Sequence, residues 1–182
     1  MKFIAGIKHN SASYTKLCKM QFNVFYFVVR FIRVGIALLF LAGGYISRNI
    51  ILLSFLFVVM GLVLLTGAFT PYQNNARKMK RQLTNGYPQT EYRFKDNVLI
   101  AKNQYVNKEF GYNEVQCVFE DSKYYYLFMN NTSAHMIDKK TIENAENFGL
   151  FLVEKTGCKI KKGFADFWKE SKKTLWSANK SI

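Results

Sequence analysis

The chain has 182 residues, with 26 Lys and Arg against 12 Asp and Glu, 49% apolar residues, two prolines and three cysteines. This length fits one domain, or one small domain with a membrane segment, and it excludes large barrels and multidomain enzymes. Two prolines and the lack of a low-complexity tract exclude collagen-like and proline-rich disordered proteins.

The excess positive charge is concentrated in the first half of the chain. The first 90 residues contain eleven Lys and Arg and no acidic residue, whereas residues 91–182 contain fifteen basic and twelve acidic residues, a net charge of +3. A nucleic-acid-binding protein would need a basic face on its folded domain. Here the excess charge brackets two apolar stretches, which is typical of a membrane protein with cytoplasmic flanks. We therefore expect no nucleic-acid partner.

The two apolar stretches predict a transmembrane hairpin. Residues 50–69 carry no charge, and at roughly 1.5 Å per helical residue they are long enough to cross a bilayer core. A buried helix of a soluble protein is the alternative. Residues 25–46 predict the first span, with Arg30 and Arg33 toward one end, where their guanidinium groups can reach the headgroups. The three polar residues 47–49 suffice for a tight turn between antiparallel spans.

Basic residues flank both outer ends of this hairpin, whereas the turn carries only Arg48. The flanking residues are Lys2, Lys8, Lys16 and Lys19 before the first span, and Arg77, Lys78, Lys80 and Arg81 after the second. The excess of Lys and Arg on cytoplasmic loops predicts a two-span protein of the cell membrane with both termini in the cytoplasm.

The second half of the chain predicts strands followed by a helix. Polar pairs separate five short β-prone runs, an arrangement typical of an antiparallel meander. Over residues 141–156 the apolar positions recur every three or four residues, which predicts a helix that ends at Gly157 and covers one face of the sheet. The five runs are residues 91–95, 98–101, 114–120, 123–129 and 132–137.

The two ends of the chain carry weaker patterns. Residues 1–7 could form a strand, and a helix that starts between Asn10 and Ser13 could run continuously into the first span. Residues 159–182 carry seven lysines, with Phe164, Phe167, Trp168, Leu175 and Trp176 mainly on one helical face. This pattern fits a helix that lies on the anionic inner leaflet, and equally a solvated tail.

The predicted fold class is thus an α+β membrane protein, a two-helix transmembrane hairpin followed by a small antiparallel β-sheet domain with a C-terminal helix. Its expected parts are a cytoplasmic N-terminal segment (1–23), the hairpin (24–71), a basic linker (72–89), the cytoplasmic domain (90–158) and a basic amphipathic tail (159–182).

Ten residues are candidates for contact with the membrane surface, because they are cationic or aromatic and lie near the spans or in the tail. The partner that we expect for them is the bilayer, with its anionic inner-leaflet headgroups. The ten are Arg30, Arg33, Arg77, Lys78, Lys80, Arg81, Lys161, Lys162, Trp168 and Trp176.

A search for catalytic or metal-binding patterns finds none. His9 and His135 lack Cys or acidic neighbours at metal-ligand spacing, and the common nucleotide, zinc and nucleophile motifs do not occur. We expect a protein without catalytic residues, metal or cofactor. The three cysteines should be reduced thiols in a cytoplasm-facing protein. Tyr124, Tyr125 and Tyr126 could present an exposed aromatic face, or lie half in the core as strand residues.

Residues 91–103 and 110–142 carry a family resemblance. A Tyr-x-Phe strand and a short strand come first, followed by an aromatic-led strand, a Tyr-Tyr-Leu strand, a strand that ends before basic residues, and a helix. This order resembles the YcxB-like family of bacterial membrane proteins. The departures are Tyr112, where tryptophan is common, and Asp138-Lys139 in place of Pro-Lys. The resemblance implies a PH-like domain on a membrane hairpin and brings no catalytic residues.

Three hypotheses on function follow. The leading one is a membrane-anchored interaction or regulatory module that holds a protein partner or a lipid headgroup near the inner leaflet. The second is an accessory or immunity-type subunit, whose hairpin packs against a larger membrane complex. The third is an enzyme of an unrecognised kind.

Overall fold

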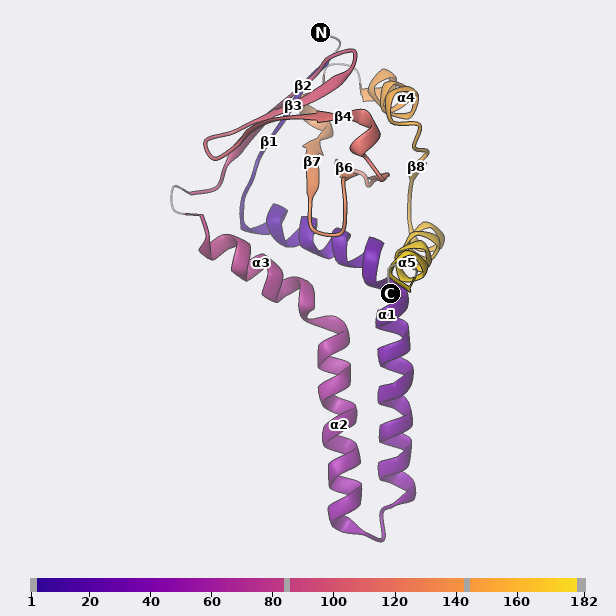
Figure 1. Cartoon of the computed structure of the whole chain (residues 1–182). Coiled ribbons are helices and arrows are strands. Elements are labelled where there is room, and N and C mark those ends of the chain that lie inside the picture. The colour runs from indigo at the N-terminus through magenta and orange to yellow at the C-terminus, as the bar shows by residue number, and fades with distance from the viewer. Residues whose placement is uncertain (1–2, 84–85, 143–144, 180–182) are drawn as a thin grey trace.

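The computed structural model describes residues 3–83, 86–142 and 145–179, with the backbone alone for residues 145–146 and 175–179. Figure 1 shows a mixed α/β body from which a pair of helices projects as an arm. The helices are α1 (Ser11–Ile46), α2 (Ile51–Phe69), α3 (Pro71–Arg81), α4 (Ala145–Thr156) and α5 (Phe164–Asn179), with short 3₁₀ turns η1 (Tyr112–Glu114) and η2 (Lys139–Thr141). The predicted α+β layout is confirmed.

The strands form two sheets, not one meander. The first sheet has the order β1-β2-β3-β4, and the second has the order β7-β6-β5-β8. Neighbouring strands are antiparallel except β5 and β8, which are parallel. The strands are β1 (Phe3–Lys8), β2 (Gln89–Phe94), β3 (Val98–Lys102), β4 (Asn107–Gly111), β5 (Cys117–Glu120), β6 (Tyr124–Phe128), β7 (Ala134–Asp138) and β8 (Ile160–Lys161).

The predicted sheet differs from the observed one in two kinds of strand: a strand that pairs with a partner far away in the sequence, and a strand that is mostly polar. β1 pairs with β2, Phe3 opposite Phe94, so the helical hairpin and α3 are inserted between two adjacent strands of one sheet. None of the five predicted runs covers β4, because its first three residues, Asn107 to Glu109, are exposed and polar. The predicted strand 114–120 begins only at Cys117, after the turn η1.

The core lies between the two sheets and the helices that cover them. In β2 every second side chain is buried, and Tyr92 and Phe94 are at most 2% exposed. The central strand β6 is buried on both faces because α1 packs on one side, with Phe25 against Phe128, and α4 on the other, with Phe148 against Tyr125. The tyrosines 124–126 are therefore all buried, and the hypothesis of an exposed aromatic face is wrong.

Helix α1 serves both the body and the arm. Asn10 caps its start, since the Asn10 side chain accepts from the Ser13 backbone N–H and the Ser13 hydroxyl accepts from the Asn10 N–H. Its first half lies along the sheets, and Figure 1 shows the helix changing direction beside α5 before its second half runs antiparallel to α2. Three of the four predicted span bounds lie within one residue of a helix end, at Ile46, Ile51 and Phe69, whereas Phe25, the predicted start of the first span, lies inside α1.

Helices α3 and α5 lie where the arm leaves the body. Pro71 starts α3, as its fixed φ and missing N–H allow at a first helical position, and α3 packs along the first half of α1. α5 packs against α1 near Phe25 and Val28. We call α3, α5 and residues 11–30 of α1 the base, and residues 34–69 the arm. Residues 72–89 thus hold most of a helix, and residues 159–182 hold β8 and a helix that packs on the body.

Candidate functional site

The arm presents a broad apolar surface that the chain itself does not cover. Between Val34 and Phe69 only Arg48, at the tip, is charged. Small residues face inward, with Ala37 and Ala68 fully buried between the helices, whereas Leu39, Ile51 and Leu52 are more than 70% exposed. Soluble monomers rarely expose apolar surface on this scale. Both α1 and α2 are long and apolar enough to cross a membrane.

Two predicted contacts, Arg30 and Arg33, lie where the arm meets the base. The Arg30 guanidinium lies over the Phe69 ring, 4.4 Å from its centroid. Arg33 Nη1 donates to the Gly67 carbonyl oxygen at 3.2 Å. That carbonyl is one of the last four of α2, which have no partner within the helix and carry its negative partial charge. Both arginines thus join α1 to the C-terminal end of α2.

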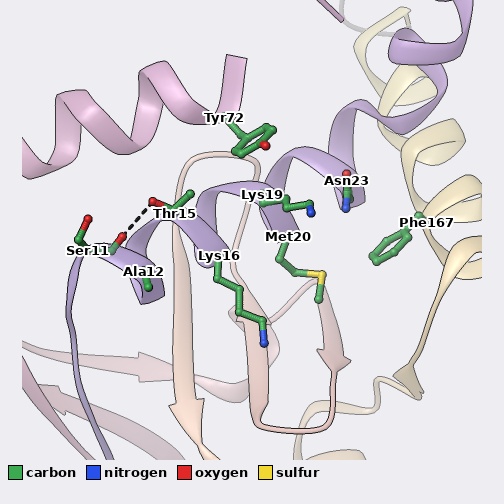
Figure 2. A pocket seen from close by; sticks show the side chains of 9 residues that line it. All are labelled: Ser11, Ala12, Thr15, Lys16, Lys19, Met20, Asn23, Tyr72 and Phe167. Carbon is green, nitrogen blue, oxygen red and sulfur yellow. Dashed lines mark hydrogen bonds between the residues drawn. The ribbon is translucent and has the colours of Figure 1, made fainter. Parts of the chain in front are cut away.

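A groove of about 740 Å³ runs along one flank of α1. Lys16 and Met20 line it on the side next to the sheet and the core. At about 100° per residue, Ala12 and Lys19 lie on the side of the helix opposite Leu17, which is in the core. Figure 2 shows Tyr72, from α3, on one side of this groove and Phe167, from α5, on the other.

The groove is cationic. Lys16 at its edge bonds to the Asp121 carboxylate at 2.8 Å, and Lys80 of α3 donates to the hydroxyls of Ser11 and Thr15 at 2.7 and 3.2 Å. Lys19 is exposed and makes no hydrogen bond or ion pair with any residue that the structure describes. Within the same described residues, no acidic side chain lines the groove.

The predicted contacts in the tail are mostly occupied by the body itself. Lys161 forms an ion pair with Glu170 at 2.6 Å, and Lys162 pairs with Glu120. Trp168 packs edge-on against Phe27 and Phe31 of α1, with 6.3 and 6.1 Å between centroids.

The remaining predicted contacts lie on α3 and α5. Arg77, Lys78 and Arg81 are exposed on α3. Trp176 belongs to α5, but its side chain lies outside the described residues.

Two carboxylates, Glu120 and Glu170, bond to lysines of the body. Burial alone would raise the pKa of Glu120, but hydrogen bonds from Lys162 and Lys139 lower it below the usual value. Burial alone would also raise the pKa of Glu170, but hydrogen bonds from Lys161 and Lys173 lower it below the usual value. These acids are therefore ionised structural partners of the lysines.

Three groups that could do chemistry are withdrawn from solvent: His9 and Cys117 are buried, and His135 is half-buried. Burial lowers the pKa of both His9 and His135 to about 4, so both are neutral near pH 7. Burial raises the pKa of the Cys117 thiol to about 12, which keeps it protonated. Among the described residues, no group of three or more His, Cys, Asp or Glu could hold a metal ion. The three cysteines are free thiols.

Strands β3 to β7 and most of α4 coincide with a known sequence family. A family model described as YcxB-like protein matches residues 94–152. The resemblance to the YcxB-like family is confirmed. The match begins at the last residue of β2 and ends within α4, so the YcxB-like segment holds β3 to β7 but leaves out β1, the arm, α3 and α5. No curated protein and no solved structure matched the chain.

The groove beneath the YcxB-like segment was not predictable from the sequence pattern. Its residues come from α1, α3 and α5, and Tyr72 and Phe167 lie far apart in the chain. In the sequence, Lys19 is one of several basic residues that flank the first span. The one feature that points to the groove is its four-residue spacing from Thr15 and Asn23, which puts all three on the polar side of α1.

Proposed function

We propose that this chain is a membrane-anchored, non-enzymatic interaction module. The arm spans the bilayer, and the YcxB-like segment is held on the cytoplasmic side, at the inner leaflet. The observation that carries the proposal is the junction between an uncharged arm with outward apolar side chains and a base that carries the cations.

The orientation is supported by where the cations lie. The base carries Arg30, Lys78, Lys80 and their neighbours, whereas the tip of the arm carries only Arg48. Short loops rich in Lys and Arg stay in the cytoplasm. β1 and α5, the first and last elements, both lie on the body side of the arm (Figure 1), which favours cytoplasmic termini.

The body is joined to the arm firmly, which supports a role in presenting one defined face. Only His9 and Asn10 separate β1 from α1. Lys16 of α1 bonds to Asp121 at the end of β5, and Phe25 packs edge-on against Phe128 of β6. A helix that belongs to both parts fixes their relative orientation, unlike a flexible linker.

The PH-like description of the cytoplasmic domain belongs to this proposal too. It is supported by two mainly antiparallel sheets followed by a covering helix, α4. The alternative of an accessory subunit depends on a hairpin rich in glycine and aromatic residues. Two of the glycines are used within the arm, since Gly44 faces Val58 and Ser54 while Gly61 faces Leu41 and Ala37, so they do not favour a larger complex.

Charged substitutions on the arm test the anchoring. Leu62 is 53% exposed near the middle of α2, so Leu62→Arg would be harmless in water but costs about 2.5–3.5 kcal/mol in a bilayer core. We expect the wild-type chain to stay with membranes through an alkaline wash and Leu62→Arg to be partly released. Tyr87→Arg, at an exposed site outside the arm, is the control. Release of the wild-type chain would contradict the proposal.

A further inference from the structure

We propose that the groove beneath α1 binds the phosphate group of an anionic phospholipid, with Lys19 as its main ligand. This inference rests on the proposed function, because it places the groove at the level of the inner-leaflet headgroups. It adds a defined lipid site to a general attraction between a basic surface and a membrane.

One edge of the groove faces the side from which a lipid would come. Leu17 turns toward the sheets, and Lys19, about 160° further round α1, points away from them. The arm leaves the body on that same side (Figure 1). In the proposed orientation, Lys19 therefore lies at the edge of the groove that is nearer to the membrane surface.

Donors in and beside the groove suit a phosphate. Lys19 has no partner among the described residues, and Asn23 lies one helical turn further along the groove (Figure 2). The Lys80 ammonium bonds to Ser11 and Thr15 at the edge of the groove, and an ammonium group has three N–H donors, so one of them is left. With no acidic side chain among the described lining residues, the groove has the charge that an anion requires.

Apolar side chains give the reason to choose a lipid over a free anion. Met20 and the rings of Tyr72 and Phe167 line the groove together with the lysines (Figure 2). A free phosphate ion has no apolar surface to pack against these side chains. A phospholipid does, because glycerol and the start of its acyl chains lie beside its phosphate. The apolar arm ends at Phe69, three residues before Tyr72 of the groove, so the acyl chains of a lipid in the groove would lie near it.

Lys19 stands apart from the other lysines near the base. Glu170 neutralises Lys161, and Glu120 neutralises Lys162. Lys78 is exposed but lies on the far side of α3, beside Cys18 and Gln21, and it is itself a predicted membrane contact. The control lysine is therefore Lys95, which is exposed in the turn after β2, outside the base, and does not line the groove.

Lipid retention by the full-length chain tests the proposal. The protein is placed in nanodiscs of phosphatidylcholine with a minority of phosphatidylglycerol, and native mass spectrometry counts the lipids that remain bound after release. We expect the wild type and Lys95→Gln to retain phosphatidylglycerol. Lys19→Gln should bind it roughly tenfold more weakly, since it loses a charge-assisted hydrogen bond. Equal retention by Lys19→Gln and Lys95→Gln would overturn the lipid site.

Two further experiments distinguish a failure of the lipid site from a failure of the proposed anchoring. A wild-type chain that does not enter nanodiscs of phosphatidylcholine alone would overturn the proposed anchoring itself. Amine acylation of Lys19, in a zwitterionic detergent, reports the ligand: phosphatidylglycerol should protect Lys19 and inorganic phosphate should not. Equal protection by inorganic phosphate would assign the groove to a free anion and overturn the lipid proposal.

Discussion

The hydroxyl of Ser171 in α5 is inserted into the backbone hydrogen-bond ladder of α1. The Val28 N–H donates to Ser171 Oγ at 2.9 Å, and Ser171 Oγ donates to the Phe25 carbonyl oxygen at 3.2 Å. Ser171 is completely buried. A side chain inserted into the ladder is a known cause of helix bends, and Figure 1 shows α1 changing direction where α5 meets it. Ser171 thus sets the direction in which the arm leaves the body.

Removing that hydroxyl should destabilise the junction. Ser171→Ala leaves the Val28 N–H and the Phe25 carbonyl without their partner in a buried place, a loss of about 1–3 kcal/mol in the free energy of unfolding. Thermal unfolding in detergent measures it, with Ser122→Ala at an exposed turn as control. An unchanged unfolding temperature for Ser171→Ala would show that the hydroxyl does not hold the bend.

Close packing within the arm should depend on Gly61. A Cβ there would meet Leu41 side-chain carbons at 2.8 Å and the Ala37 carbonyl oxygen at 3.2 Å, whereas a Cβ at Gly67 would meet nothing within 4 Å. We expect Gly61→Leu to separate α1 from α2 and to lose about 1–3 kcal/mol of stability. Gly67→Leu should have little effect. Similar unfolding temperatures for the two variants would contradict this packing.

Asp121 should matter more than the lysine with which it pairs. Its carboxylate accepts from Lys16, from the backbone N–H groups of Lys123 and Tyr124, and from the Tyr126 hydroxyl. Asp121→Ala loses all four and should cost about 2–4 kcal/mol. The Lys16 side chain is 42% exposed, so Lys16→Ala should cost only about 0.2–1 kcal/mol. Equal losses in denaturant unfolding would mean that the ion pair alone matters.

Stability should fall as the pH falls below neutral. Burial, with a smaller contribution from Lys108, lowers the pKa of His135 to about 4, and burial does the same for His9. Between about pH 6.5 and pH 4 the unfolded state therefore binds more protons than the folded state, so stability is full above pH 6.5 and is lost toward pH 4.

Replacing one histidine isolates its share of that pH dependence. The His135 ring packs edge-on against Phe110, and its Nε2 has no partner among the described atoms, so His135→Phe keeps the ring packing and removes the titration. We expect a shallower fall in unfolding temperature between about pH 6.5 and pH 5. The same slope in this variant and in the wild type would exclude His135 as a contributor.

The local patterns of the sequence predict the elements whose periodicity is strong. The uncharged run gives α2, the three- and four-residue spacing gives α4, and Gly157, with a φ of +66°, stands just after Thr156 as expected. These features depend on residues that are neighbours in the chain. The uneven distribution of Lys and Arg along the chain likewise predicts that the cations gather where the arm meets the body, without any knowledge of packing.

The relationships between distant segments could not be predicted in this way. Nothing in residues 3–8 specifies that β1 pairs with β2, on the far side of the whole arm. The pairing of Lys162 with Glu120, and the insertion of Ser171 between Phe25 and Val28, join residues that are 42 to 146 positions apart. The groove around Lys19 depends on these same contacts, because α5 forms one of its sides.

The topology of the arm tests the central claim most directly. In cells that express the full chain, Asn49→Cys puts a thiol at the tip of the arm, and Lys102→Cys puts one on the exposed side of β3. A membrane-impermeant maleimide should label Asn49→Cys from outside the intact cell and should label Lys102→Cys only after the membrane is opened. The wild-type chain, with Cys18 and Cys117 buried, gives the background. Labelling of both positions, or of neither, in intact cells would contradict a spanning hairpin with a cytoplasmic domain.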